Sequence, residues 1–342
     1  MADRRIYIDK APGEIRGVVT LDGKPERLLI EREGETWPFL GLRRRARVIL
    51  VDRALGLAAL DLGEGQEASL RLKADRAPPV QGQSLDVEIT IEPQGGKPAV
   101  ARALPPDVDL GESSLSLEQR LAVLGPTAPL VMGREARAVA DEAEEEALAV
   151  EHRLGAGVSL AIEPTRALTA VDIDLAAAGG DGKRAARQAN LAALAALGRL
   201  LRLKALGGLV VVDLVGRGHD GQALTHAAQA AFAVDQPGVA IGPITKFGTL
   251  ELALPRRYRP IREILCDRTG ALTPVTLALR VVRAIERQAR AAPGDRFVAR
   301  CAPEVAAAAA LPAEMLKGTI GARFEIVPDP AFRPDQWDIA SP

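Results

Sequence analysis

Three aspartates stand at the ends of two apolar segments and are the residues best placed to do chemistry. Asp172 and Asp174 close the segment ALTAVDID, and Asp213 closes the apolar run of GLVVVDLV. Residues two apart in an extended strand share a face, so Asp172 and Asp174 point the same way. Carboxylates gathered in one place repel each other and resist desolvation unless a divalent cation joins them. Oxygen ligands in this number suit Mg²⁺ or Mn²⁺ and indicate phosphoryl-transfer chemistry.

The sequence between the aspartates is typical of a strand–helix–strand unit. A GGD turn ending at Asp181, a long helix over about 182–204 and a Gly-Gly stop separate the two apolar segments. We expect the two strands to be parallel neighbours, with Asp172 and Asp213 side by side at the carboxyl edge where open α/β sheets bind ligands. Asp181 is predicted to be a helix N-cap. The alternative is that Asp172 and Asp213 also only cap the turns that follow them.

Other candidate groups offer weaker patterns. His152, His219 and His226 have no HExxH arrangement, and we interpret all three as structural or exposed. The acidic run DEAEEE at 141–146 is predicted to be a solvated helix face rather than a metal cluster. The absence of GxSxG, P-loop and Gly-rich fingerprint sequences disfavours serine hydrolases, NTPases and dinucleotide-dependent enzymes.

Two basic clusters interrupt a chain whose charges nearly cancel. Lys and Arg number 44 against 45 Asp and Glu, so only a local patch could attract a polyanion. The clusters are GLRRRARV and PRRYRPIRE, each of which could also be a solvated surface. Together they favour contacts with a phosphate backbone, for which the candidates are Arg43, Arg44, Arg45, Arg47, Arg256 and Arg257.

The length and the hydrophobic pattern predict several domains. The 342 residues exceed the roughly 250–300 residues at which one core stops growing. Short alternating segments over 5–103 predict a small antiparallel barrel or sandwich, with a boundary near Leu104. From Gly155 the pattern changes to alternating strands and helices.

The cysteines and the hydropathy favour the reducing cytoplasm. Cys266 and Cys301 stand far apart, which excludes a disulfide framework or a four-cysteine zinc site within one chain. The first residues lack an apolar h-region, and no window approaches the roughly 18 apolar residues of a spanning helix. We therefore expect neither export nor a membrane partner.

The stretch 157–256 resembles the catalytic region of the ribonuclease E/G family. The segments SLAIEPTRALTAVDID, NLAALAALGRLLRLKALGGLVVVDLV and GPITKFGTLELALPR keep that family's order and register. The run ARVILVDRALGLAALDLGEG resembles its RNA-binding OB-fold, and the tail 277–328 is similar to its small carboxyl-terminal domain.

The resemblance implies a multidomain fold of the α+β and α/β classes. The expected parts are an OB-like RNA-binding β-barrel over 1–104, a linker with helices over 105–155, an α/β metal-dependent nuclease domain with a mixed sheet over 156–264, and a small α/β domain over 265–342.

The resemblance also implies roles for single residues. Asp172 and Asp213 would bind a catalytic Mg²⁺, in an endoribonuclease that leaves a 5′-phosphate and a 3′-hydroxyl. Asp174 stands where the family has Asn and is a third catalytic candidate, either as an extra ligand or by changing the metal preference. The implied RNA contacts are Lys246, which replaces the family's Arg before Phe-Gly, and the basic helix end with Arg202 and Lys204.

Three features depart from the family pattern. Thr269 stands where the second cysteine of the zinc link belongs, so we expect no zinc. A homodimer would form without it, and TLELAL is the exposed edge strand that could pair between subunits. No match is found for the pocket that senses a 5′-monophosphate, so cleavage should not depend on the 5′ end. Leu60 and Ser69 replace the barrel's stacking aromatics, which removes about 1–3 kcal/mol per base.

The leading interpretation is a cytoplasmic, magnesium-dependent endoribonuclease acting on single-stranded RNA, either ribosomal precursors or messenger RNA. The first alternative is a non-catalytic RNA-binding descendant, suggested by the lost sensor, the lost stacking residues and Asp174. Retention of Asp172 and Asp213 argues against it, because acids without a metal would only destabilise the fold. A magnesium nuclease acting on DNA rests on fold analogy alone.

Overall fold

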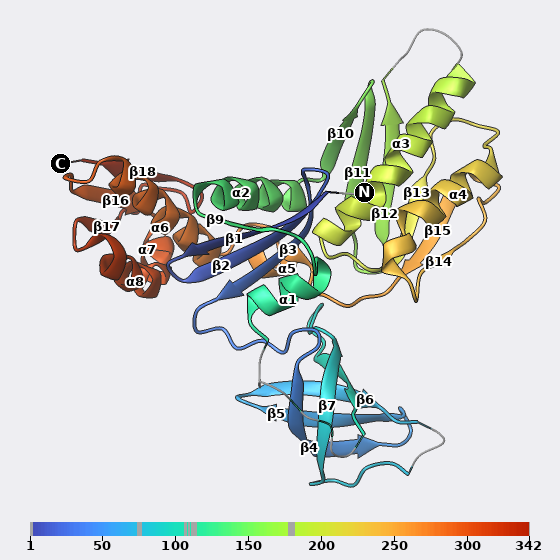
Figure 1. The fold of residues 1–342 in the computed structure, drawn as a ribbon, viewed down its shortest axis with the longest axis horizontal. Coiled ribbons are helices and arrows are strands. Elements are labelled where there is room, and N and C mark those ends of the chain that lie inside the picture. Colours follow the sequence, from blue (N-terminus) through green and yellow to red (C-terminus); the bar gives the residue numbers. More distant parts are fainter. Residues whose placement is uncertain are drawn as a thin grey trace.

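The chain folds into a barrel and three sheets with their helices (Figure 1). The computed structural model describes residues 3–73, 77–105, 108, 110, 115–176 and 182–341. Asp181, the predicted helix cap, lies outside these residues. Among the residues described, no helix combines the length and hydropathy that crossing a bilayer requires.

A four-stranded sheet lies at the centre of the molecule. Strands β1 (Arg4–Ala11), β2 (Glu14–Leu21) and β3 (Lys24–Arg32) form an antiparallel meander. The short β9 (Leu130–Met132) pairs in parallel with β1. The expectation of one barrel over 1–104 is therefore wrong for its first third, because alternation identifies strands but does not show which of them pair.

Helices from the predicted linker cover both faces of this central sheet. α1 (Leu117–Leu124) packs Leu117 and Leu121 on one face, and α2 (Arg134–Leu148) packs a row of alanines on the other. The region 105–155 thus supplies a strand and two helices to the central sheet and is not only a connection.

The barrel itself has five strands and lies below the central sheet in Figure 1. Its members are β4 (Arg43–Asp52), β5 (Leu57–Gly63), β6 (Gln66–Arg71), β7 (Ser84–Ile91) and β8 (Ala99–Ala103). They close in the order β4-β5-β6-β8-β7 around an aliphatic core. A five-stranded barrel of this kind is OB-like, which confirms the predicted class of this part.

A six-stranded mixed sheet forms the largest layer, in the order β10-β11-β12-β13-β15-β14. β12 and β13 are parallel, and the other neighbours are antiparallel. The predicted mixed sheet is confirmed. Its strands are β10 (Glu151–Gly155), β11 (Val158–Pro164), β12 (Thr169–Leu175), β13 (Gly208–Asp213), β14 (Ala240–Ile241) and β15 (Thr249–Leu254).

Two helices cover one face of this sheet. α3 (Gly182–Leu203) connects β12 to β13, and α4 (Gly221–Ala231) follows β13, with a 3-10 turn over Ala233–Asp235. Both helices pack on the alternate apolar residues of the strands. Gly198 permits their close approach, because a Cβ there would lie 2.5 Å from the Ala231 carbonyl oxygen.

Two predictions about this sheet's margins are wrong. β10 belongs to the sheet although the expected boundary at 155 separated it. TLELAL, which is β15, is no open edge, because Gly242 N donates to Glu251 O at 2.9 Å and Thr245 N donates to Thr249 O at 2.9 Å. A segment that returns along β15 therefore occupies its hydrogen bonds.

The C-terminal part is a small α/β layer, as predicted. It is built around one long helix over 274–291 and ends in a four-residue strand, which is too short for its pattern to be seen in the sequence. The elements are α5 (Ile261–Leu265), α6 (Pro274–Ala291), β16 (Phe297–Cys301), α7 (Pro303–Ala308), α8 (Ala310–Ile320), β17 (Phe324–Pro328) and β18 (Trp337–Ala340).

Buried ion pairs tie α2 to the central sheet. Arg16 on β2 is 1% exposed in its side chain and pairs with Asp9 at 2.6 Å. The same guanidinium reaches Asp141 at 2.7 Å and Glu144 at 3.0 Å on α2. The prediction of a solvated face for the acidic run 141–146 is thus wrong for the buried Glu144, whereas Glu142 and Glu145 are exposed. Within the same run, Glu146 pairs with Arg199 of α3 at 2.6 Å.

The same ion-pair network extends to α6. Arg280 pairs with Glu144 at 2.6 Å, and Arg283 pairs with Glu14 of β2. Burial alone would raise the pKa of Glu144, but the facing guanidinium groups of α6 and β2 outweigh burial and lower it. The carboxylate is therefore ionised and shared between elements far apart in sequence.

We predict that Glu144→Gln lowers the free energy of unfolding by about 3–5 kcal/mol, because it leaves buried guanidinium groups without their counter-charge. Urea denaturation measures this difference. Glu142→Gln, two residues away but exposed, is the matched control and should change stability by less than about 0.5 kcal/mol. Equal effects of the two substitutions would contradict a structural role for the buried carboxylate.

Candidate active site

Asp172 and Asp213 are direct register partners on the parallel strands β12 and β13. Both side chains are exposed, whereas Val171 and Val212 on the opposite face are buried beneath the helices. Neighbouring strands lie about 4.8 Å apart, so two paired residues present their carboxylates side by side on one face. The expected juxtaposition is present, and a metal role for the pair stays a prediction.

Asp174 lies on the same open face, two residues further along β12. It pairs with Ser159 of β11, beyond the last paired residue of β13. Its Oδ1 accepts a hydrogen bond from Leu175 N at 2.8 Å. Asp174 is thus placed at the rim of the site, beside the Asp172–Asp213 pair.

The donor set of this edge fits Mg²⁺. Within the described parts of the chain, no group of three or more His, Cys, Asp and Glu has the geometry to hold a metal. The adjacent pair Asp172 and Asp213 offers oxygen ligands only, and it is open to solvent. Mg²⁺ is commonly held by one or two carboxylates, with water and substrate phosphates as further ligands. Structural zinc requires about four N or S ligands, which this edge does not present.

Asn190 of α3 fixes the backbone that follows Asp213. Its side chain is 1% exposed, and its Nδ2 donates to Val215 O at 3.0 Å while its Oδ1 accepts from Val215 N at 3.0 Å. Leu214 N also donates to Gly248 O at 3.2 Å. The end of β13 is therefore held from two sides, which limits the movement of the Asp213 carboxylate.

A tight turn over 245–249 stands beside this strand end. Thr245 Oγ1 accepts hydrogen bonds from Phe247 N at 3.3 Å and from Thr249 N at 3.2 Å, and Thr249 is the register partner of Asp213. Gly248 adopts a φ of 89°, and a Cβ there would lie 3.2 Å from Nε2 of His219. The turn presents Lys246 to solvent, with its ammonium 5.0 Å from the centre of the Phe247 ring.

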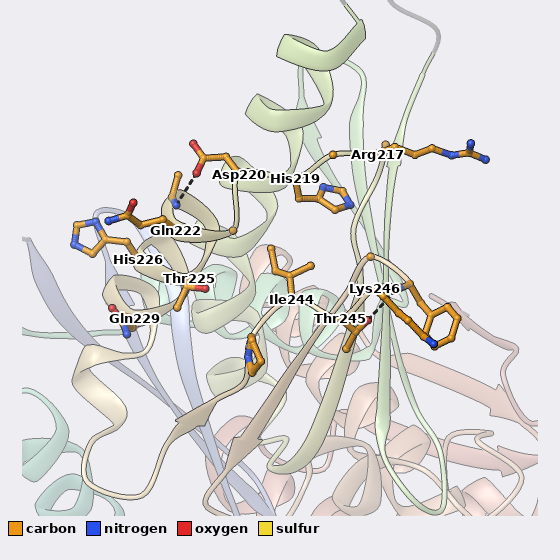
Figure 2. Close-up of a pocket in the computed structure, with 17 residues that line it drawn as sticks. Arg217, His219, Asp220, Gln222, Thr225, His226, Gln229, Ile244, Thr245 and Lys246 are labelled. Atoms are coloured by element: carbon orange, nitrogen blue, oxygen red, sulfur yellow. Dashed lines mark hydrogen bonds between the residues drawn. The ribbon is translucent and has the colours of Figure 1, made fainter.

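An open groove of about 1380 Å³ runs from this turn to helix α4 (Figure 2). Lys246 and Thr245 lie on one side of it, and Gln222, Thr225 and Gln229 of α4 lie on the other. Asp220 caps α4 by accepting from Ala223 N at 3.2 Å and also pairs with Arg187. That cap bond and Arg187 lower the pKa of Asp220.

The basic helix end does not face solvent, so the prediction of RNA contacts there is wrong. Lys204 is buried and donates to the carbonyl oxygens of Glu146, Ala147 and Ala149 at the end of α2. Burial lowers its pKa to about 8. Arg202 pairs with Glu26 at 3.0 Å and with Asp235 at 2.7 Å. A basic pattern in sequence does not show which side of a helix is covered.

The first basic cluster is largely neutralised by acids of neighbouring strands. Arg43 pairs with Glu88 at 3.1 Å, and Arg45 with Asp86 at 2.8 Å. Arg44 approaches Glu64 at 3.5 Å, whereas no described residue forms an ion pair with the exposed Arg47. The barrel therefore offers a weaker positive patch than its arginine count suggests.

The second basic cluster lies beyond β15. Arg256 is exposed and lies against Gly208, where a Cβ would come within 2.4 Å of its Nε. Arg257 is half-buried and donates to Pro237 O at 3.0 Å. Arg256 is thus the member of this pair that could meet a phosphate.

The two barrel positions proposed to have lost stacking aromatics are not both on the surface. Leu60 is fully buried in the barrel core. Ser69 is half-buried, and its hydroxyl donates to Ala99 O at 3.3 Å. Leu60 therefore faces away from any RNA, and its equivalence to an RNA-stacking residue is wrong.

The three histidines are placed as predicted, buried or at the surface. His152 is buried, and its pKa falls to about 4 because of burial first and the nearby Lys204 second. His219 and His226 line the groove.

Phe247 and the groove were not predicted from the sequence. Phe247 is 80% exposed and is the one exposed aromatic ring among the described residues. The signal that could have identified it is an aromatic residue between a lysine and a glycine, because such a turn cannot bury its ring. The groove depends on the packing of α4 and was not visible in the sequence.

The fold and the site define a multidomain α/β protein with an OB-like barrel and a pair of adjacent aspartates at the carboxyl edge of a mixed sheet. Residues 134–257 match the model of the ribonuclease E/G family. This match and the relatives below support membership of the chain in the ribonuclease E/G family.

Three relatives show the extent of the similarity. Ribonuclease E of Escherichia coli (strain K12) is 35% identical over 156 residues, which cover 42% of this chain and 15% of that protein. Ribonuclease E of Haemophilus influenzae is 34% identical over 160 residues, which cover 42% of this chain and 17% of that protein. Ribonuclease G of Salmonella typhimurium is 25% identical over 217 residues, which cover 57% of this chain and 43% of that protein. The chain thus spans less than half the length of each.

We predict that Asn190→Asp loosens the loop after β13, because the carboxylate can accept from Val215 N but cannot donate to Val215 O. Unfolding free energy should fall by about 1–3 kcal/mol, the cost of a buried group left unsatisfied. Amide exchange at Val215 should also become faster. Gln188→Glu on the exposed face of α3 is the control. Unchanged exchange at Val215 would show that Asn190 does not hold the loop.

We also predict that stability falls as the pH drops from 6.5 towards 4 because of His152. The pKa of an unfolded histidine is about 6.5, and that of folded His152 is about 4, so the unfolded chain binds more protons in this window. His152→Gln should remove up to about 3 kcal/mol of that fall, measured by urea denaturation at several pH values. The exposed His226→Gln should leave the slope unchanged, and a similar slope in both variants would refute the assignment.

Proposed function

We propose that this protein is a magnesium-dependent endoribonuclease that cleaves single-stranded RNA to 5′-phosphate and 3′-hydroxyl ends. The observation that carries the proposal is the register pairing of Asp172 with Asp213 on an open strand edge, within the segment that matches the ribonuclease E/G family. The curated relatives are named ribonuclease E and ribonuclease G, which supports RNA as the substrate.

The residues of this chain divide the work between binding and positioning. Asp172 and Asp213 would hold Mg²⁺, which supplies nucleophile activation and neutralises charge on the phosphate. Asn190 and the turn 245–249 hold the Asp213 strand end in place. Lys246 stands exposed on that turn and would contact the backbone of the RNA.

Asp174 is proposed to tune the metal rather than to be its main ligand. It lies on the same face but outside the register pair. A third carboxylate at this rim raises the negative charge around a bound cation. Asp174→Asn, the residue type found in the family, should therefore retain cleavage and alter the ratio of Mg²⁺ to Mn²⁺ activity.

We further propose that the chain works without a zinc link and in the cytoplasm. Cys266 is buried, with a pKa that burial raises, and Thr269 donates its hydroxyl to Asp267 at 2.6 Å. A protonated, buried thiol is a poor metal ligand. Any association of two copies would therefore form without zinc. The size of the protein in solution measures it.

We predict that Asp213→Asn and Asp172→Asn each lower kcat/KM for a labelled single-stranded RNA by at least about 100-fold, which equals roughly 2.7 kcal/mol. Glu163 on the neighbouring strand β11 is an exposed carboxylate on the same face of the sheet as Asp172, but nearer the opposite edge of the sheet. Glu163→Gln therefore serves as the matched control. Cleavage that persists in EDTA, or in the two aspartate variants, would overturn the proposal.

The same assay tests dependence on the RNA 5′ end. We expect equal rates for substrates with a 5′-triphosphate and a 5′-monophosphate. A strong preference for the monophosphate would show that a sensing site exists in this chain.

A further inference from the structure

The turn that carries Lys246 also presents an unusual ring. Phe247 is 80% exposed, although the chain has only 10 aromatic residues and the structure covers the other nine at least in part. An apolar ring in water gains nothing for the fold, because burial is what makes such a side chain stabilising. Its position beside the paired carboxylates leaves the ring available to stack on a ligand bound there.

The backbone that carries the ring is held by hydrogen bonds. Phe247 N donates to Thr245 Oγ1, and Gly248 N donates to Thr245 O at 3.1 Å. Gly248 O in turn accepts from Leu214 N, the residue after Asp213. The Phe247 backbone is thus coupled through two short connections to the strand end that carries the candidate metal ligand.

The two faces of the ring differ in their surroundings. The Lys246 ammonium lies 5.0 Å from the ring centre, which is a cation–π contact. A flat ligand can occupy the remaining area of the ring while the ammonium meets an anion attached to that ligand. A nucleotide has this combination, with a base that stacks and a phosphate that pairs with a cation.

The groove beyond the turn has the chemistry of a single-strand track. Gln222, Thr225, His226 and Gln229 follow the spacing of one helix face on α4, and all four line the groove. Their side chains make no hydrogen bond to described residues. Uncharged donors and acceptors suit sugar hydroxyls and base edges, and the 2′-hydroxyl is what distinguishes RNA from DNA.

The volume of the groove agrees with an extended ligand. Its roughly 1380 Å³ exceeds the 300–1,000 Å³ of ordinary small-molecule sites. The groove is also open to solvent rather than enclosed. A strand of several nucleotides fits this shape better than one small molecule does.

We propose that Phe247 is a base-stacking platform for a nucleotide next to the scissile phosphate, and that the α4 groove receives the strand beyond it. The proposal rests on the proposed ribonuclease function and adds where the substrate lies. It assigns the stacking role to the catalytic domain itself, beside the aspartates, and not to the barrel.

Binding is tested without cleavage, in EDTA, with a single-stranded RNA that carries 2-aminopurine. Stacking on Phe247 should quench the probe, and Phe247→Ala should abolish the quenching and weaken binding roughly 5- to 150-fold. Phe247→Trp should restore both, whereas Phe247→Leu, which is apolar but lacks a π face, should not. Val123→Ala removes a similarly exposed apolar group from α1 and should change nothing.

Several outcomes would overturn the stacking proposal. They are equal binding by wild type and Phe247→Ala, rescue by Phe247→Leu, or no binding of single-stranded RNA at all. The groove is tested separately, with the double variant Gln222→Ala and Gln229→Ala. We expect it to lose affinity for a long RNA but little for a dinucleotide or for the DNA of the same sequence. Unchanged affinity for the long RNA would remove the groove from the proposal.

Cleavage kinetics then separate this proposal from the function on which it rests. If Phe247→Ala raises KM with kcat nearly unchanged while Asp213→Asn abolishes cleavage, both hold. If quenching depends on Phe247 but no RNA is cleaved by the wild type, the ribonuclease proposal fails and the stacking site stands as an RNA-binding site. If cleavage occurs with KM independent of Phe247, the stacking proposal alone fails.

Discussion

The parallel pairing of β12 with β13 sets the geometry of the candidate site. Parallel register places Asp172 directly opposite Asp213, and two like charges so close are unfavourable without a cation or a solvent route to disperse them. The helices that bury Val171 and Val212 fix the strands in this register, because a slip of one residue would turn the valines outwards and the aspartates into the core. The apolar face thereby determines the geometry of the polar one.

The groups around the pair serve to hold it rather than to add ligands. Asn190 reaches from α3 to the backbone after Asp213, and Gly248 accepts from Leu214 on the other side. These bonds are local, but the sheet itself is anchored by distant charges. Arg199 on α3 pairs with Glu146 of α2, and α2 is joined to β2 and α6 through Arg16, Glu144 and Arg280. Ion pairs on α2 thus connect the six-stranded sheet to the C-terminal layer.

Most of the six-stranded sheet could be predicted from sequence because its signals are local. A short apolar run predicted β13, the 3.6-residue period predicted α3, and their order required parallel neighbours. What failed was non-local. The pattern of β1 to β3 resembled that of the barrel strands, and nothing in it showed pairing with β9 from beyond residue 104. Arg202 and Lys204 were predicted to lie on a basic surface, because the sequence does not show that α2 and β3 cover them.

The open face of the sheet is acidic, so the proposed phosphodiester substrate would need contacts outside the aspartate pair. Asp172, Asp174 and Asp213 would repel a polyanion, and the barrel's arginines are mostly paired with acids of neighbouring strands. Attraction would therefore come from a bound cation and from exposed bases near this edge, such as Lys246 and Arg217. Uncharged contacts would add to it. An exposed ring and a polar helix face supply binding that salt does not screen, so affinity for RNA should depend less on ionic strength than it would for a protein that holds the backbone by arginines alone.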